Sequence, residues 1–189
     1  MSNDLSRRQL LKAGGGFLGG TACTTLLGSN LASVLASTTL SGQTEWRYCQ
    51  KCQAMFFNGY LSKGYCPAAA GGHEAAGYNF VLPHDVPPTP NAQRDWRYCQ
   101  KCQVMFFDGY LSKGYCPAGG GHEAAGYNFV LPHDVPPTPS AQAEWRYCYK
   151  CQAMFFNGYP SKGYCPAGGG HEAAGYNFVL PHFIPGQDI

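Results

Sequence analysis

Charge is scarce in this 189-residue sequence. Asp, Glu, Lys and Arg make up 13% of it, about half of the share that is usual in globular proteins. Arg7, Arg8, Lys12 and Asp4 lie in an N-terminal leader described below, and without them ten basic and ten acidic residues remain. A net charge near zero gives no electrostatic footprint for a nucleic acid or an anionic membrane. We therefore expect no nucleic-acid partner.

Helical periodicity and catalytic pairs are missing as well. From residue 37 onward no stretch shows a convincing helical period, whereas residues 45–49 and 78–82 alternate between apolar and polar as strands do. His73-Glu74 is followed by Ala-Ala-Gly and lacks the second His of a metalloprotease HExxH helix. No nucleophile paired with a base stands out beyond the cysteines and histidines. We expect an all-β protein that is not an enzyme and has no catalytic residues.

The first 36 residues are typical of an export signal. The string SRRQLLK at 6–12 closely resembles the twin-arginine motif of bacterial Tat export, and small residues up to Ala36 suit signal peptidase. Gly and Thr make the intervening stretch weakly hydrophobic, so we expect no stable membrane span after cleavage; an uncleaved anchor is the alternative. Cys23 follows a poor lipobox, with Gly20 in place of Leu. We expect a periplasmic or extracellular protein.

Three near-identical units fill the rest of the sequence, each opening on Trp-Arg-Tyr-Cys. Units under about 40 residues usually need disulfides, a metal or mutual packing to be stable. The Pro-rich connections favour extended spacers, and hence separate modules like beads on a string; a single β-trefoil made of the three repeats is the alternative. The chain divides into a linker at 37–45, repeat 1 at 46–84, a linker at 85–95, repeat 2 at 96–133, a linker at 134–144, repeat 3 at 145–182 and a tail at 183–189.

Asn58-Gly59 predicts a β-hairpin within repeat 1. Asn-Gly between apolar runs is a strong hairpin signal, because a type I′ turn needs positive φ at both central residues. The other repeats carry Asp-Gly and Asn-Gly at the same place. Counting outward from this turn brings Cys66 back to Cys49 and Cys52, so we expect three thiols close together in every unit.

The cysteines and one histidine of each unit have metal-ligand spacing. The pattern is C-x2-C-x13-C-x6-H in repeat 1 and C-x2-C-x13-C-x5-H in the others, and Cys3His is a structural zinc set whose closed coordination leaves no site for water. Disulfides are the rival interpretation for an exported protein, although three cysteines per unit leave one thiol unpaired; a redox role or another metal is a third. The twin-arginine route carries folded proteins, which removes the main objection to zinc outside the cell. The predicted ligands of about three zinc ions are Cys49, Cys52, Cys66, His73, Cys99, Cys102, Cys116, His122, Cys148, Cys151, Cys165 and His171.

The run WRYCxKCQxMFFxGY…GYCPAGGGHEAAGYNFVL resembles a short Trp/CxxC/CPAGGxH module that recurs, singly or in tandem, in secreted bacterial proteins. The resemblance covers residues 46–182 and implies an extracellular accessory module without a settled activity. In its ligands each unit is also similar to a zinc ribbon. Its second knuckle differs, because Cys66 and His73 are separated by six residues where a ribbon has C-x2-C.

The aromatic residues suggest a binding surface. Each unit carries at least eight, more than a small core hides, so some are expected to form a platform for a sugar or another apolar surface. We expect multivalent binding of an extracellular polysaccharide or surface protein; a self-assembling structural protein and a thiol redox protein are the alternatives. His84, His133 and His182 are expected to be half-exposed strand ends, with substitute ligands as the alternative. The candidate ligand-binding residues are Trp46, Phe56, Tyr60, Trp96, Phe106, Tyr110, Trp145, Phe155 and Tyr159.

Overall fold

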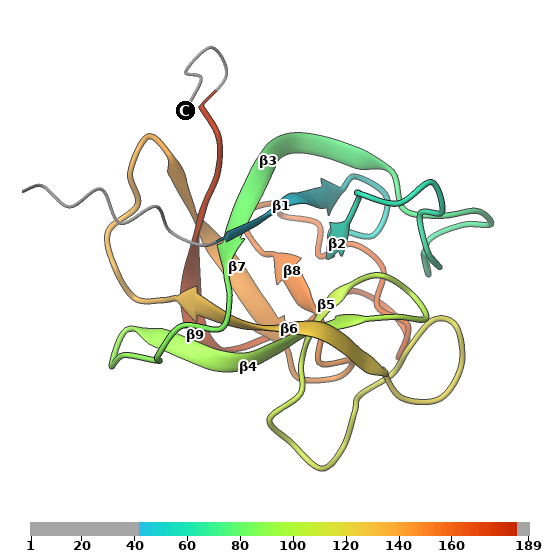
Figure 1. The fold of residues 1–189 in the computed structure, drawn as a ribbon. Coiled ribbons are helices and arrows are strands. Elements are labelled where there is room, and N and C mark those ends of the chain that lie inside the picture. The colour runs from blue at the N-terminus through green and yellow to red at the C-terminus, as the bar shows by residue number, and fades with distance from the viewer. Residues whose placement is uncertain (1–41, 185–189) are drawn as a thin grey trace, which may run out of the picture. The chain divides into compact units, whose positions relative to one another are not determined.

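The computed structural model describes residues 42–184, which belong to one compact unit, Thr38–Ile189. The predicted export signal and Cys23 lie outside these residues. The described part contains no helix, and therefore none long and apolar enough to cross a membrane. The all-β prediction is confirmed (Figure 1). The strands are β1 Gly42–Cys49, β2 Met55–Phe57, β3 Ala75–Pro83, β4 Ala92–Cys99, β5 Met105–Phe107, β6 Ala124–Pro132, β7 Ala141–Cys148, β8 Met154–Phe156 and β9 Ala173–Pro181.

Each repeat forms a three-stranded antiparallel sheet with the Trp-bearing strand in the middle. The orders are β2-β1-β3, β5-β4-β6 and β8-β7-β9. In repeat 1, Trp46 lies opposite Phe57 on one side and Phe80 on the other. Apolar side chains that meet across strands stabilise such a sheet, and the alternation seen in the sequence places Trp46 on its buried face.

The hairpin predicted at Asn58-Gly59 is wrong. Strand β2 pairs with β1, and residues 58–74 form an irregular loop. Neither residue of the pair has the positive φ of a type I′ turn. The backbone amide of Asn58 donates to the Glu45 carbonyl at 2.8 Å, which keeps it beside β1. Gly59 is needed for another reason: a Cβ there would meet the Phe57 ring at 2.5 Å.

The three repeats share one core, so the expectation of beads on a string is also wrong. Both hydrophobic clusters draw residues from all three repeats: one holds the nine cysteines and the other holds the tryptophans. Short bridges link β2, β5 and β8 in a closed cycle. The backbone amide of Phe57 donates to the Gln103 carbonyl at 2.9 Å, and the same bond runs from repeat 2 to 3 and from 3 to 1. Of the alternative, a single β-trefoil, the structure confirms that the three repeats share one core, whereas the strands form three separate sheets.

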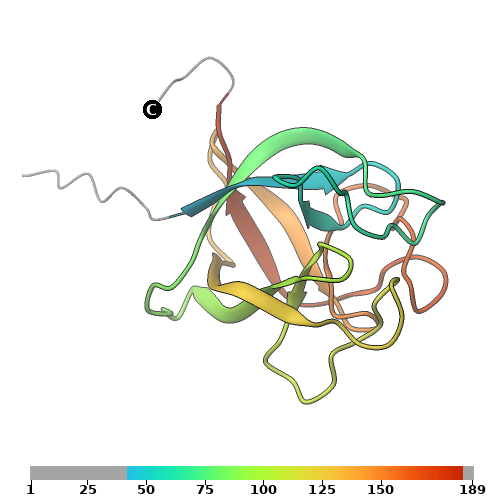
Figure 2. The ribbon, with the colours of Figure 1, turned by 45° about the vertical axis from the view of Figure 1, so that its right-hand side comes forward.

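The Pro-rich connections lie at the opposite end from the three long Cys/His loops (Figures 1 and 2). They are folded against the next repeat rather than acting as extended spacers. The amide of Asp85 donates to the Asn128 carbonyl at 2.8 Å, and Thr89 forms a tight turn with Ala92. The tail repeats the pattern, because the amide of Phe183 donates to Asn79 of repeat 1 at 3.0 Å. The last repeat is thus tied to the first.

Candidate metal centres and inter-repeat pockets

The Cys-x-x-Cys pair of each repeat sits on the tight turn between the first two strands. In repeat 1 the amide of Gln53 donates to the Cys49 carbonyl at 2.8 Å, and the amide of Cys49 donates to Ala54 at 3.0 Å. Gln53 adopts a left-handed φ of 67° to complete the turn. This geometry points the thiols of Cys49 and Cys52 to the same side.

The long loop delivers the third cysteine and the histidine. Lys63 holds it together, since its Nζ donates to the carbonyls of Asn58 and Tyr60 at 2.8 and 2.7 Å, while its own carbonyl accepts from the His73 amide at 2.8 Å. The glycines act as expected: in repeat 2 a turn closed by Gly120 has positive φ that other residues rarely adopt. The cysteine therefore reaches the pair by a route other than the predicted hairpin.

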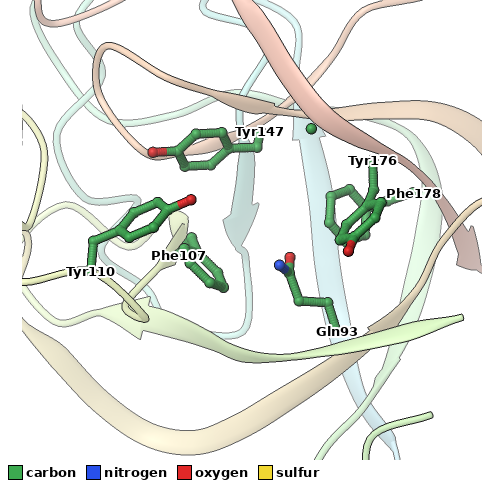
Figure 3. A pocket seen from close by; sticks show the side chains of 7 residues that line it. Gln93, Phe107, Tyr110, Tyr147, Tyr176 and Phe178 are labelled. Carbon is green, nitrogen blue, oxygen red and sulfur yellow. The ribbon is translucent and has the colours of Figure 1, made fainter. Parts of the chain in front are cut away.

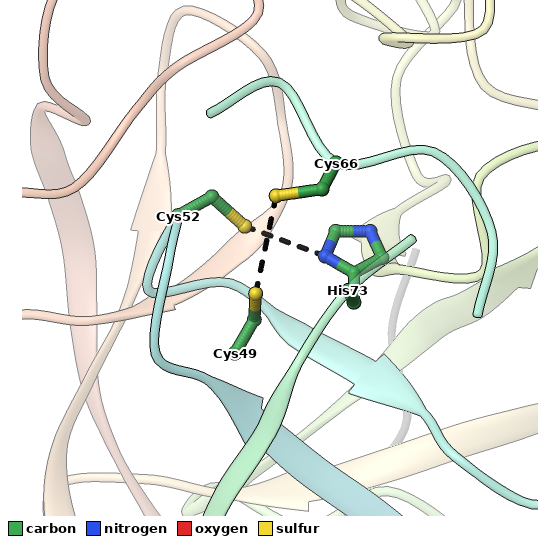
Figure 4. A group of neighbouring side chains, drawn as sticks. All are labelled: Cys49, Cys52, Cys66 and His73. Carbon is green, nitrogen blue, oxygen red and sulfur yellow. Dashed lines mark hydrogen bonds between the residues drawn. The ribbon is translucent and has the colours of Figure 1, made fainter. Parts of the chain in front are cut away.

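The four side chains of each cluster converge on one point. In repeat 1 the Sγ atoms of Cys49 and Cys66 are 4.0 Å apart, and Cys52 Sγ is 3.4 Å from His73 Nδ1 (Figure 4). The ligand atoms of each cluster lie within 4.8 Å of one another, and all four residues are buried. A tetrahedron with zinc bonds of about 2.3 Å to sulfur and about 2.0 Å to nitrogen needs edges of about 3.5–3.8 Å. The residues therefore fit a metal ion.

Disulfide bonding does not describe these clusters. The nine cysteines from Cys49 to Cys165 are free, and a sulfur separation of 4.0 Å is about twice a disulfide bond length. All three predicted Cys3His sets are brought together, and each could hold one metal ion. The prediction of three repeated antiparallel β units, each with its own Cys3His cluster, is thus confirmed.

The clusters favour thiolate at their first cysteine. Hydrogen bonds from Cys52 and then Cys66 hold the pKa of the Cys49 thiol far below its usual value. The backbone amide of Glu74 also donates to Cys49 Sγ, at 3.5 Å. Glu74 therefore lies next to the cluster and contacts it through its backbone. By contrast, burial raises the pKa of Cys102 in repeat 2. The thiolate is the form of cysteine that binds a metal. Each cluster therefore has one cysteine that is readily deprotonated, whereas burial disfavours the charged form of a neighbouring one.

Each cluster also contacts the next repeat. His73 Nε2 lies 3.2 Å from the Cys102 carbonyl, and the equivalent distance from repeat 2 to repeat 3 is 3.1 Å. Gly64, with φ of 63°, lies so close that a Cβ would be 2.1 Å from that same carbonyl. From repeat 3 to repeat 1 the amide of Tyr164 donates to the Cys52 carbonyl at 3.3 Å. The Cys-x-x-Cys turn of every repeat is therefore also in contact with a neighbouring repeat.

The candidate aromatic ligand-binding residues divide into two groups. Their tyrosines are about half exposed: 54% for Tyr60, 54% for Tyr110 and 51% for Tyr159. The other six have no accessible surface to offer a ligand, because the repeats bury them together in the shared core. The prediction of ligand binding is therefore wrong for Trp46, Phe56, Trp96, Phe106, Trp145 and Phe155.

Three equivalent pockets lie between neighbouring repeats, and each contains one of the exposed tyrosines. Their volumes are about 270, 270 and 300 Å³. Figure 3 shows the pocket between repeats 2 and 3. It is lined by Gln93, Phe107, Tyr110, Tyr147, Gly175, Tyr176 and Phe178. The sequence indicated exposed aromatics but not these pockets, because residues from two different repeats complete each of them.

The second histidine of each repeat fastens the repeats together. His84 stacks on Tyr127 of repeat 2 and His133 on Tyr176 of repeat 3, and His182 closes the cycle on Tyr78 of repeat 1; each pair of ring centroids is 3.7 Å apart. Only 4% of His133 and 7% of His182 are exposed, so the expectation of half-exposed strand ends is wrong for these two, whereas His84 is partly buried. None of the three belongs to a Cys cluster in the described chain. In the sequence, the only sign of this role was the Pro-His pair that ends each repeat.

Searches of known proteins give no further guide. No family model, no curated protein sequence and no solved structure matches this chain. The resemblance to a secreted module thus remains a sequence-based prediction.

Proposed function

We propose that the chain is an exported, non-catalytic protein that holds one structural zinc ion in each repeat and binds an extracellular glycan through several sites at once. The observation that carries the binding role is the threefold repetition of an open pocket on a single rigid core. Sites fixed on one body raise the effective concentration of a repetitive ligand for one another without new contacts.

Zinc is the metal that best fits the donor set. Three soft thiolates and an imidazole in a compact, buried group suit a closed tetrahedral zinc site. His73 would bind through Nδ1, which leaves the ring proton on Nε2 to donate to the Cys102 carbonyl. Such a second hydrogen bond fixes the tautomer and orientation of a ligating histidine. The ion would therefore brace its own repeat and the contact to the next one.

Metal analysis with free-thiol counting on the purified mature protein tests the zinc assignment. Three zinc ions per chain and nine protected thiols that appear only after chelation and unfolding are the expected result. Metal-free protein that keeps its fold, or cysteines paired as disulfides, would contradict it. Rapid alkylation of the zinc-loaded protein would instead favour the redox alternative.

The binding role is tested with whole mature protein, because the shared core leaves no repeat complete on its own. We expect it to be retained by at least one insoluble polysaccharide, among cellulose, chitin and peptidoglycan, or by bacterial cells. Its dissociation from the polymer should be much slower than from a short soluble oligomer. If the protein binds none of these polysaccharides and no bacterial cells, the proposal is wrong.

Self-association is the second candidate. The Pro-rich connections form an apolar groove of about 400 Å³ at the end opposite the metal clusters, lined by residues such as Val86, Pro87, Val135 and Pro136. Apolar patches of this kind mark interaction sites on many proteins. Light scattering that shows a monomer over a wide range of protein concentration would rule this candidate out.

A further inference from the structure

The pocket between repeats has two preformed aromatic walls. Phe107 and Tyr110, from repeat 2, lie edge to face at 5.1 Å, and Tyr147 of repeat 3 is 6.1 and 6.2 Å from them. Tyr176 forms the opposite side, where His133 stacks on it at 3.7 Å and fixes its plane. Rings that already touch their neighbours lose little conformational entropy when a ligand binds.

A single amide supplies directed polarity between these walls. The Oε1 of Gln93 accepts a hydrogen bond of 3.0 Å from the indole Nε1 of Trp96, which holds the amide in place. Its Nε2 donates to no other group in the described part of the chain, and Figure 3 shows the amide pointing into the space between Phe107 and Tyr176. The other pockets repeat the arrangement, with Gln43 on Trp46 and Gln142 on Trp145 at 3.0 and 3.1 Å.

The pocket is uncharged. None of its lining residues is ionic. Burial, together with the nearby Tyr110, raises the pKa of Tyr147 to about 12, so this phenol stays neutral at physiological pH. Arg146, next to Tyr147 in the sequence, is directed to the Gly175 carbonyl at the pocket edge, where its Nη2 donates at 2.9 Å. A charged ligand would lose its hydration without gaining a partner, so the lining selects a neutral one.

The size of the pocket fits one ring. Volumes of about 270 to 300 Å³ lie at or just below the lower limit of the range for small-molecule sites, about 300–1,000 Å³. Aromatic walls suit the C–H faces of a ligand, whereas phenols and a primary amide suit hydroxyl groups around its edge. A pyranose ring presents this combination.

We propose that each inter-repeat pocket binds one neutral pyranose, a hexose or an N-acetylhexosamine, so that a chain takes three. This deepens the proposed binding function and rests on it. The residues that meet the sugar are the exposed tyrosine (Tyr60, Tyr110 or Tyr159) and the tyrosine opposite it (Tyr127, Tyr176 or Tyr78), while the glutamine (Gln43, Gln93 or Gln142) donates to a hydroxyl.

Isothermal titration and saturation-transfer NMR on zinc-loaded mature protein test this directly. The probes are glucose, galactose, mannose and N-acetylglucosamine, with glucuronic acid as a charged comparator and adenosine as a flat aromatic one. Saturable binding of a neutral sugar, at three equivalents per chain, is expected. No saturable binding by the four neutral sugars, or a preference for either comparator, would overturn the assignment.

The chain offers a matched control for the site. Tyr60, Tyr110 and Tyr159 are changed to Ala together; the control changes Tyr65, Tyr115 and Tyr164, which are 61%, 60% and 57% exposed and line none of the three pockets. The pocket variant should bind at least about tenfold more weakly, and the control should bind like the wild type. Equal losses in both variants would refute the site.

Two further readouts keep the outcomes separate. If the pocket variant loses its zinc or its cooperative unfolding, sugar-induced shifts of the Tyr110 ring resonances in the wild type decide instead, with Tyr115 as the reference that should not move. If the pocket variant still binds insoluble polysaccharide as the wild type does, this inference fails and the proposed function stands. If the wild type binds no polysaccharide or cell at all, the proposed function itself has failed.

Discussion

Two glycines with nearly the same backbone conformation allow a sharp test of the shared core. Gly64 has φ of 63° and Gly77 has φ of 65°. A Cβ at Gly64 would lie 2.1 Å from the Cys102 carbonyl oxygen of the next repeat, whereas one at Gly77 would meet nothing within 4 Å. The substitutions Gly64→Ala and Gly77→Ala therefore impose a similar backbone strain, and only the first adds a clash with another repeat.

The difference in unfolding free energy can be worked from these contacts. Both variants carry the strain of a left-handed alanine, about 1–2 kcal/mol, and both gain the same small amount from a stiffer unfolded chain, so these effects cancel. Gly64→Ala adds overpacking against a backbone carbonyl, about 1–3 kcal/mol. Moving that carbonyl also weakens its 3.2 Å contact with His73, a hydrogen bond worth about 1 kcal/mol. We expect Gly64→Ala to be the less stable by about 2–4 kcal/mol.

Thermal unfolding in zinc-saturated buffer measures this difference. For a domain of this size it corresponds to a melting temperature lower by on the order of 10 °C for Gly64→Ala than for Gly77→Ala. Zinc content is measured for both variants, so that a lost ion is not mistaken for a packing effect. Equal melting temperatures would show that Cys102 does not press on Gly64 and would refute the shared core.

Three other predictions address the metal, the tyrosines and the stacked histidines. Competing chelator should unfold all three repeats in one transition, since their clusters share a core; three separate transitions in circular dichroism would contradict this. Burial raises the pKa of Tyr98 to about 12, as for its two equivalents, against about 10 in the unfolded chain; the folded state thus keeps these protons longer, and stability should fall as pH rises from about 10 to about 12. Ultraviolet titration should show three tyrosines that ionise near pH 12. Ionisation of all tyrosines in a single transition near pH 10 would contradict the raised pKa values. A double-mutant cycle on His133→Ala and Tyr176→Ala should give a coupling of about 0.5–1.5 kcal/mol in unfolding free energy, and additive effects would mean that the stack contributes nothing.

The metal clusters were largely predictable because ligand chemistry is local. Cys-x-x-Cys on a tight turn, a third thiol and a glycine-hinged histidine define a donor set whatever the path between them. The path itself was not predictable from turn propensity. Asn58 is held to β1 by its bond to Glu45, and Phe57 is bound to Gln103 of another repeat; these tertiary bonds override the local preference for a hairpin.

The way in which the repeats pack was the larger difference from expectation. Composition favoured extended spacers at 85–95, but Asp85 caps the next repeat through Asn128. Nothing in one copy of a repeat shows that its partner is another copy. The same holds for His84, whose stacking on Tyr127 joins residues that no local pattern relates.

The closure of repeat 3 onto repeat 1, through His182 on Tyr78, fixes the number of repeats. Two copies would leave both ends of the cycle open, and a fourth would have no edge left to join. Long tandem identities in a gene favour unequal recombination, which removes or adds whole copies. In a string of independent beads such products would still fold, whereas here they would be defective. The ring therefore ties the folding of each copy to the presence of the other two.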